Sequence, residues 1–254
     1  RYGDDVTVLV TGDSWRTQVE DRNGVTIVKA GRLIETASTP LSARLSWYLY
    51  GQRPDITHLH FPYPPGEVSQ WPLLRRRATV LTYHSDVVRQ QRLLRYYRPA
   101  MLRILKRIDR IIVTSPSYLA SSEVLRLVAD RCKVVPLGID QTPFRQVPPE
   151  AVADLERRYG DGPWVLFVGV LRYYKGLRYL IEAMQQIPAR LLIVGQGPEE
   201  PRLREQVAQL GLQDKVIFAG AVSDADLPAY YRLARLFCLP ASERSEAFGL
   251  VQVE

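Results

Sequence analysis

The sequence predicts two doubly wound α/β domains in one chain of 254 residues. Runs of Val, Ile and Leu recur at regular intervals, as they do in parallel strands covered on both faces. Helix-like stretches separate most of these runs, which is the alternation expected of βαβ units. A stretch rich in proline and turn residues, 139–150, divides the series and predicts a linker. We therefore expect domains at 1–145 and 146–254.

Each predicted element follows from a short pattern in the chain. In the first series, strands are expected at 6–10, 25–30, 55–60, 78–84, 110–115 and 133–138. Helices are expected there at 41–51, 91–108 and 117–129. In the second series, strands are expected at 164–169, 189–195, 215–220 and 236–240, and helices at 176–187, 199–210 and 224–234.

Both ends of the sequence suggest a fragment. The chain enters at RYGDDVTVLV, which resembles the second strand of an α/β domain more than its first. The last expected helix has barely begun at Glu254. We expect both domains to be truncated.

The composition is that of a soluble globular protein, with 46% hydrophobic and 24% charged residues. No apolar run approaches the ~18 residues of a membrane-spanning helix, and no signal peptide is recognisable. Cys132 and Cys238 lie far apart in apolar runs and are expected to be buried free thiols. Three histidines without a Cys/His cluster predict no metal site.

The net charge of +7 is concentrated in the first part of the chain. Residues 1–150 contain 22 Lys and Arg against 14 Asp and Glu, whereas residues 151–254 contain 12 against 13. This asymmetry predicts an anionic partner for the first domain.

Six short stretches of the sequence, taken together and in their order, are characteristic of one protein family. They are TYHSD (82–86), VVPLGID (134–140), FVGVLRYYKGLRYLIEA (167–183), LLIVGQGPEEPRL (191–203), VIFAGAVSDADLPAYY (216–231) and SEAFGLVQVE (245–254). In this order they resemble the family 4 retaining glycosyltransferases, which have the two-domain GT-B fold with a cleft between Rossmann-like domains. The resemblance implies transfer of a sugar from a GDP- or UDP-linked donor, with no catalytic metal and no cofactor. It also implies a front-face mechanism, in which the leaving phosphate assists the acceptor hydroxyl.

The last stretch places two glutamates eight positions apart. Carboxylates accept hydrogen bonds from vicinal hydroxyls, which a nucleotide-sugar offers on its ribose and on its sugar. By resemblance, Glu246 contacts the transferred sugar and Glu254 holds the ribose. Phe248, Gly249 and Leu250 would bring backbone N–H groups to the phosphates at a helix start. A solvated pair of glutamates on a surface helix is the alternative.

The stretch VLRYYKG (170–176) follows a strand that ends at Gly169. Arg172 and Lys175 would stabilise the charge that develops on the departing nucleoside diphosphate. The family commonly has an arginine directly after the glycine, where this chain has Val170, so we expect Arg172 to take that role. This variant is similar to that of mannosyl-transferring members. A solvated basic turn is the alternative.

His84 closes the strand at 78–84 and, by resemblance, lies beside the donor sugar. His58 and His60 alternate on another strand and are expected to point to opposite faces, with His60 reaching the acceptor side. The stretch GQGP (195–198) lacks the third glycine of a dinucleotide fingerprint and predicts a turn that opens a helix at Pro198-Glu199. By resemblance, Gly195 and Gly197 border the nucleotide site.

The segment 89–110 contains eight basic residues and one acidic residue, with apolar side chains interleaved. Arg89, Arg92 and Arg95 recur at helical spacing, and residues 75–77 add three more arginines. The pattern predicts peripheral contact with an anionic membrane, although a solvated helix face explains it about as well. No nucleic-acid-binding module accompanies the charge.

Together these features predict a retaining glycosyltransferase that uses a glycan or lipid-linked acceptor in cell-surface polysaccharide assembly. It would work in the cytoplasm, at the inner face of the membrane. A catalytically incomplete donor-binding fragment is the alternative outside enzymes, because the family's glycine-rich loop would precede this chain. A nucleotide-sugar epimerase or a phosphorylase of the same fold is the enzyme alternative.

Overall fold

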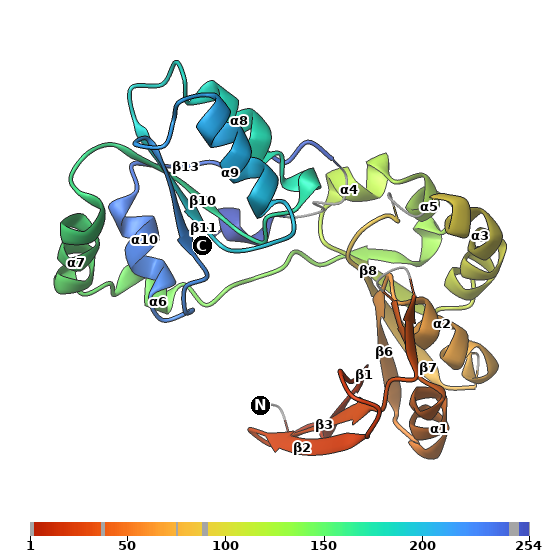
Figure 1. Ribbon diagram of the computed structural model, residues 1–254. Coiled ribbons are helices and arrows are strands. Elements are labelled where there is room, and N and C mark those ends of the chain that lie inside the picture. Colours follow the sequence, from red (N-terminus) through yellow and green to blue (C-terminus); the bar gives the residue numbers. More distant parts are fainter. Residues whose placement is uncertain (1–2, 37–38, 75, 88–90, 244–248, 254) are drawn as a thin grey trace. The chain divides into compact units, whose positions relative to one another are not determined.

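The computed structural model describes residues 3–36, 39–74, 76–87, 91–243 and 249–253 of the chain. It divides into two compact units, residues 1–136 and residues 137–254 (Figure 1). The sequence-based boundary lies between 145 and 146, whereas the structure groups residues 137–145 with the second unit.

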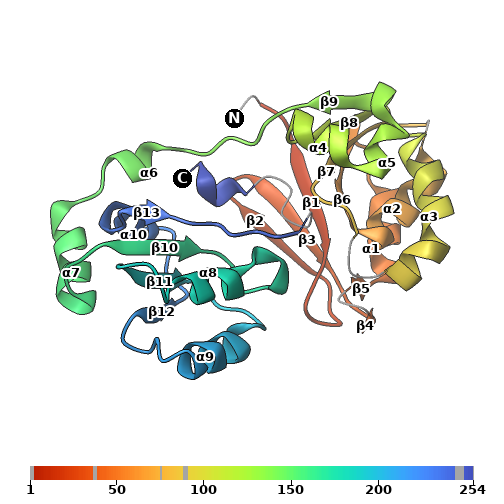
Figure 2. The ribbon, with the colours of Figure 1, turned by 90° about the horizontal axis from the view of Figure 1, so that it is seen from above.

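The second unit is an α/β domain with a parallel sheet in the order β12-β11-β10-β13. Its strands are β10 (Trp164–Val168), β11 (Arg190–Val194), β12 (Val216–Gly220) and β13 (Leu236–Phe237). Its helices are α6 (Thr142–Arg145), α7 (Pro149–Tyr159), α8 (Leu177–Ala183), α9 (Glu200–Gln209) and α10 (Leu227–Leu233). The 3₁₀ turns are η3 (Tyr173–Lys175) and η4 (Leu250–Gln252). Figure 2 shows β13 and β10 side by side.

Alternation along the buried strand β10 builds two apolar layers in this unit. Val165 and Phe167 pack with α8 and α9, whereas Trp164, Leu166 and Val168 pack with α7 and α10. Figure 1 shows these two pairs of helices on opposite faces of the sheet. Because both faces are covered, the strands are continuous apolar runs, as the sequence predicted.

The first unit contains the remaining elements. Its strands are β1 (Val6–Thr11), β2 (Gln18–Arg22), β3 (Val25–Ala30), β4 (Ile34–Thr36), β5 (Thr39–Leu41), β6 (Ile56–Phe61), β7 (Ala78–Tyr83), β8 (Arg110–Val113) and β9 (Cys132–Val134). Its helices are α1 (Ala43–Gly51), α2 (Pro64–Gln70), α3 (Gln91–Leu105), α4 (Pro116–Ser121) and α5 (Glu123–Arg126), with 3₁₀ turns η1 (Trp71–Leu73) and η2 (Ala129–Arg131).

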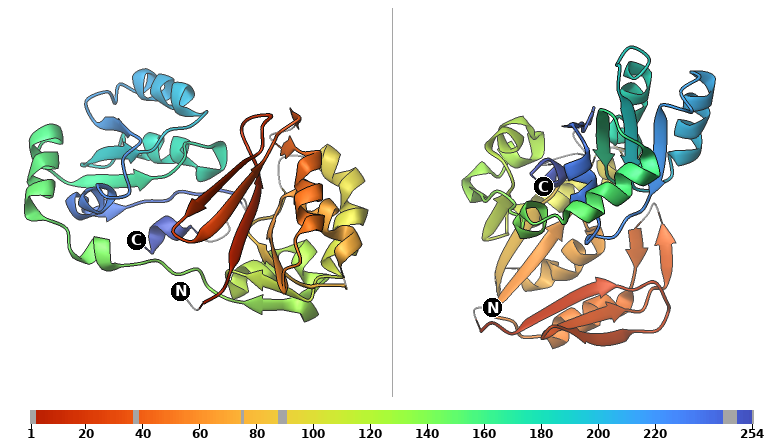
Figure 3. Two further views of the ribbon diagram at one scale, coloured as in Figure 1. Left: turned by 90° about the horizontal axis from the view of Figure 1, so that it is seen from below. Right: turned by 90° about the vertical axis from the view of Figure 1, so that its left-hand side faces the viewer.

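Within the described residues, the strands of the first unit form three sheets: β1-β3-β2, the hairpin β4-β5, and the parallel sheet β6-β7-β8-β9. Figure 3 shows β1, β2 and β3, in red, as a sheet separate from the orange and yellow strands. Helix α1 packs against β1 and β3, and α2 packs against both α1 and β6. The parallel sheet places the carboxyl ends of β6 and β7 at one edge, where the histidines lie.

Helix α3 has one buried face and one exposed basic face. Met101, Ile104 and Leu105 are fully buried, whereas Arg95 and Tyr96 are exposed. The apolar face of α3 therefore packs in the interior of the unit, and its exposed face is cationic. In the described part of the chain, no helix is both long and apolar enough to cross a bilayer.

Candidate functional site

The carboxyl edge of the sheet in the second unit is built by close backbone approach. Gly195 follows β11 with φ of +127°, and a Cβ there would lie 2.1 Å from the carbonyl oxygen of Gly169. The Gly195 N–H donates to the carbonyl of Gly220 (2.7 Å), and the Gly169 N–H donates to that of Val194 (2.9 Å). The glycines that end β10, β11 and β12 thus meet at one edge. Ligands of open α/β sheets bind outside such an edge.

The loop that contains Gly197 lies against the turn that follows β10. A Cβ at Gly197 would lie 2.5 Å from the carbonyl oxygen of Leu171, so a larger residue does not fit. The Leu171 N–H donates to the carbonyl of Gln196 (3.0 Å), and its carbonyl accepts from the N–H of Glu199 (3.1 Å). Both glycines of the GQGP stretch are therefore explained by the backbone that follows β10, which lies too close to them for any side chain. Helix α9 begins at Glu200, slightly later than predicted.

Lys175 lies over the end of β10. It closes η3, and a Cβ at Gly169 would lie 3.5 Å from the Lys175 ammonium nitrogen. Lys175 is half-buried, whereas Arg172 is exposed. The structure therefore brings the predicted Lys175, Gly169, Gly195 and Gly197 together and leaves Arg172 at the surface beside them.

Gly176 is a site residue that sequence reasoning missed. Its φ is +69°, and a Cβ there would lie 2.0 Å from the carbonyl oxygen of Pro240. The Ser242 N–H also donates to the carbonyl of Tyr174 (3.2 Å). The turn that contains Lys175 is thereby fixed against the segment that follows β13. The sequence signal that could have identified this residue is the presence of a glycine directly after Lys175.

The carboxyl-terminal stretch is described only from Gly249 to residue 253. Gly249 is the N-cap of η4, and Leu250 begins that turn. The Tyr231 hydroxyl donates to the carbonyl of Val251 (2.9 Å), which joins η4 to α10. Glu246, Phe248 and Glu254 lie outside the described residues, so their roles toward sugar, phosphate and ribose stay predictions.

In the first unit, three histidines form a contact chain across β6 and β7. The Nδ1 atom of His60 lies 2.8 Å from Nε2 of His84. The rings of His58 and His60 stack with centroids 4.8 Å apart, and Nε2 of His58 lies 2.7 Å from the Thr82 hydroxyl. The prediction that His58 and His60 point to opposite faces is wrong. Residues two apart in a strand share a face, and Leu59 takes the other.

Partial burial and the charges of neighbouring histidines lower the pKa of two of these three histidines. The pKa of His84 falls below its usual range through partial loss of hydration and then through the charge of His60. The pKa of His58 falls for the same reasons, with His84 contributing as well. His84 is therefore a neutral imidazole at neutral pH, able to orient a polar ligand by hydrogen bonding.

The loop after β7, which contains His84, is fixed by Asp86. The hydroxyls of Tyr83 (2.7 Å) and Ser122 (2.8 Å) donate to one carboxylate oxygen of Asp86, and its N–H donates to the Tyr118 hydroxyl (2.6 Å). The His84 N–H donates to the carbonyl of Phe61 (3.0 Å). The sequence stretch TYHSD contains Asp86, but its pattern predicts no role for this carboxylate.

The remaining site predictions concern metals and thiols. Among the described residues, no group of three or more His, Cys, Asp or Glu side chains is placed to hold a metal ion. Cys132 and Cys238 are free thiols, as predicted, but both are half-buried, and burial raises the pKa of Cys132 to about 11.

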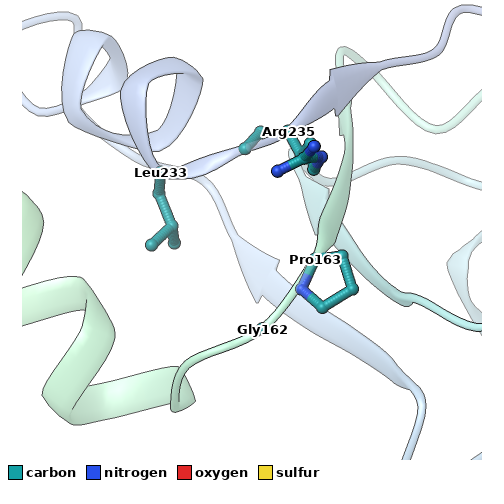
Figure 4. Close-up of a pocket in the computed structure, with 5 residues that line it drawn as sticks. Gly162, Pro163, Leu233 and Arg235 are labelled. Atoms are coloured by element: carbon teal, nitrogen blue, oxygen red, sulfur yellow. The ribbon is translucent and has the colours of Figure 1, made fainter.

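A pocket in the second unit lies at the opposite edge of its sheet. Figure 4 shows Gly162 and Pro163, which precede β10, facing Leu233 and Arg235, which precede β13. This places the pocket at the amino ends of the strands, away from Lys175 and the glycines. Arg235 is its one charged lining residue among those described.

Comparison with known proteins gave matches over nearly the whole chain. Residues 1–142 match the family model described as Glycosyltransferase Family 4, and residues 153–254 match Glycosyl transferases group 1. The chain is 37% identical to D-rhamnosyltransferase WbpZ of Pseudomonas aeruginosa over 257 residues, covering 100% of this chain and 66% of the relative. It is also 37% identical to O-antigen chain mannosyltransferase C of Escherichia coli, covering 88% and 60%. The chain thus spans less than two thirds of the length of these relatives.

Solved structures agree in fold. Sucrose-phosphate synthase from Thermosynechococcus elongatus matches with a TM-score of 0.77 and 25% identity, covering 98% of this chain and 68% of that one. HepE from Anabaena, in complex with UDP and glucose, matches with a TM-score of 0.67 and 21% identity, covering 82% and 58%. The predicted fold class, GT-B, is confirmed.

Proposed function

The chain belongs to Glycosyltransferase Family 4, and from this premise we propose that its protein transfers a sugar, with retention, from a nucleotide-sugar to a glycan or lipid-linked acceptor. The observation that supports this most is the position of Lys175 over Gly169, beside Gly195 and Gly197. A fixed cation and closely packed backbone at the carboxyl edge of a parallel sheet suit a diphosphate.

Lys175 would act on the leaving group. As the bond between sugar and phosphate breaks, negative charge grows on the nucleoside diphosphate. A half-buried ammonium on a turn fixed by Gly176 and Pro240 is preorganised for that charge, so it stabilises the transition state more than the bound donor. Arg172, exposed beside it, would contribute a second, weaker interaction because solvent screens it.

The donor sugar we propose has the manno configuration. The two 37% identical relatives are named for mannose and for D-rhamnose, which is 6-deoxy-mannose. Another relative, 36% identical over 132 residues, is named as GDP-mannose-dependent. These names favour a GDP-linked donor over a UDP-linked one, and the O-antigen relative favours an acceptor in cell-surface polysaccharide assembly. No metal or organic cofactor is part of this proposal.

The test is a donor screen with the whole protein. GDP-mannose, GDP-D-rhamnose, UDP-glucose and UDP-N-acetylglucosamine are each offered with a lipid-linked glycan acceptor, and release of nucleoside diphosphate is followed. We expect acceptor-dependent release from a GDP-linked manno donor and little from the UDP-sugars. Release from UDP-sugars alone would contradict the donor class, and release from none would contradict the function.

A further inference from the structure

The bond between His60 and His84 is made edge to edge. The two facing nitrogens are 2.8 Å apart, while the ring centroids are 5.1 Å apart and the planes differ by 9°. Two nearly parallel rings whose centroids are 5.1 Å apart can bring two nitrogens within 2.8 Å only if the rings lie in the same plane. Rings stacked face to face would hold these nitrogens farther apart. The contact is therefore an in-plane N–H···N hydrogen bond.

An in-plane bond of this kind couples the protons of the two rings. One nitrogen must carry a proton and the other must be bare, because two N–H groups or two lone pairs would repel at 2.8 Å. The tautomer of His84 is thus set by that of His60. The free edge of His84, with its Nδ1, then presents one defined hydrogen-bonding group.

Contacts with neighbouring residues hold the ring of His60 in place. Its ring stacks on that of His58, which bonds the Thr82 hydroxyl, and β6 and β7 pair His60 with Thr82 in parallel register. Asp86, two residues after His84, directs its carboxylate to the hydroxyls of Tyr83 and Ser122. The His60 ring is therefore a fixed reference for the ring plane of His84.

We propose that His60 is a positioning residue, which fixes the tautomer and ring plane of His84 for its contact with the donor sugar. This rests on the proposed function, together with the position beside the donor sugar that the sequence predicts for His84. The expectation that His60 reaches the acceptor side stays a separate prediction. Aligned by His60, the imidazole of His84 meets the sugar without reorganising during transfer.

The test compares three variants of the whole protein. His60→Phe keeps a ring but removes the nitrogen that faces His84. His60→Asn returns a hydrogen-bonding group near the position of Nδ1. His58→Phe is the matched control, because it keeps an aromatic ring stacked on His60 and leaves the bond between His60 and His84 in place.

The first measurement is ¹⁵N NMR of the imidazoles across a pH titration, without substrate. We expect one tautomer for His84 in the wild type, and in His60→Phe a tautomer mixture with a pKa raised toward its ordinary value. His60→Asn should restore a single tautomer. An unchanged tautomer and pKa of His84 in His60→Phe would overturn the inference.

The second measurement is steady-state transfer. We expect kcat to fall about tenfold in His60→Phe with a nearly unchanged KM for the donor, to recover mostly in His60→Asn, and to stay near wild type in His58→Phe. Equal impairment by Phe and Asn, or an unchanged kcat in His60→Phe, would overturn the positioning role. A wild type inactive with every donor would contradict the proposed function, whereas the NMR comparison decides the coupling of the rings independently.

Discussion

The ammonium group of Lys175 lies over the backbone of Gly169, so close that a Cβ there would be 3.5 Å from it. This relationship joins a cation to the end of β10, where the backbone of Gly195 also approaches. Because the turn is fixed by Gly176 against Pro240, the charge is held in place before any ligand arrives.

Replacing Lys175 by methionine should slow transfer more than it weakens donor binding. The charge it stabilises grows as the nucleoside diphosphate departs, so kcat should fall by on the order of 10²-fold. Arg178→Met, which removes an exposed cation three residues away, is the control and should stay near wild type. Steady-state kinetics of both variants check this, and equal losses would contradict a specific role.

Gly195→Ala should destabilise the second unit more than Gly211→Ala does. Gly211 has φ of +66°, where an alanine costs about 1–2 kcal/mol, and Gly195 has φ of +127°, a conformation that residues other than glycine rarely adopt. At Gly211 the added Cβ meets open space, whereas at Gly195 it would overlap the carbonyl oxygen of Gly169 and force the backbone apart. Urea unfolding of the two variants measures the difference, and equal losses would show that the strands do not approach as described.

Glu67 should make the stability of the first unit depend on pH. Its side chain is 1% exposed, and burial raises its pKa above the ordinary 4.5, although hydrogen bonds from Tyr97 and from the Tyr63 N–H act in the opposite direction. The folded state then binds this proton more tightly than the unfolded state does. The stability that protonated Glu67 gives to the folded state is complete below pH 4.5, and it is lost as the pH rises through the pKa of Glu67 in the folded state.

Glu67→Gln mimics the protonated acid and should remove this dependence. We expect the variant to gain stability relative to the wild type as the pH increases from about 4 to about 8. Urea unfolding across that range checks the sign. A stability difference that stays constant, or one that falls with pH, would contradict a raised pKa at Glu67.

Neutralising Arg95, Arg98 and Arg103 should weaken binding to anionic vesicles in a salt-dependent way. All three are exposed on α3, and each basic residue near such a surface contributes about 1 kcal/mol. Because the apolar face of α3 is buried in the unit, contact would be electrostatic rather than insertive. Vesicle co-sedimentation at two salt concentrations measures it.

The control for that experiment removes the same charge from the second unit, at Arg157, Arg202 and Arg204, whose side chains are 70%, 80% and 54% exposed. Binding that drops equally in both triple variants would show a general charge effect and no membrane face on α3.

Much of the fold was predictable because buried parallel strands are unbroken apolar runs. β10, β11 and β12 lie within their predicted ranges for this reason. β2, with the sequence QVEDR, was missed because a largely exposed hairpin strand needs few apolar residues. The predicted helix at 117–129 is broken at Ser122, whose hydroxyl caps α5 and donates to Asp86. No local pattern announces such a tertiary contact.

The candidate site was predictable where a motif sits at a strand end. Lys175, Gly195 and Gly197 were found in this way, and the structure brings them together. The contact between His60 and His84 was missed because it depends on the register of β6 on β7, which the sequence alone did not set.

The measurement that tests the central claim most directly is the anomeric configuration of the product. The whole protein is supplied with GDP-α-mannose and a lipid-linked glycan acceptor, and the new linkage is read from the one-bond carbon–proton coupling at its anomeric centre. Retaining transfer predicts an α-mannosyl product that forms only when both substrates are present. A β-linked product, or none from any GDP-linked manno donor, would contradict it.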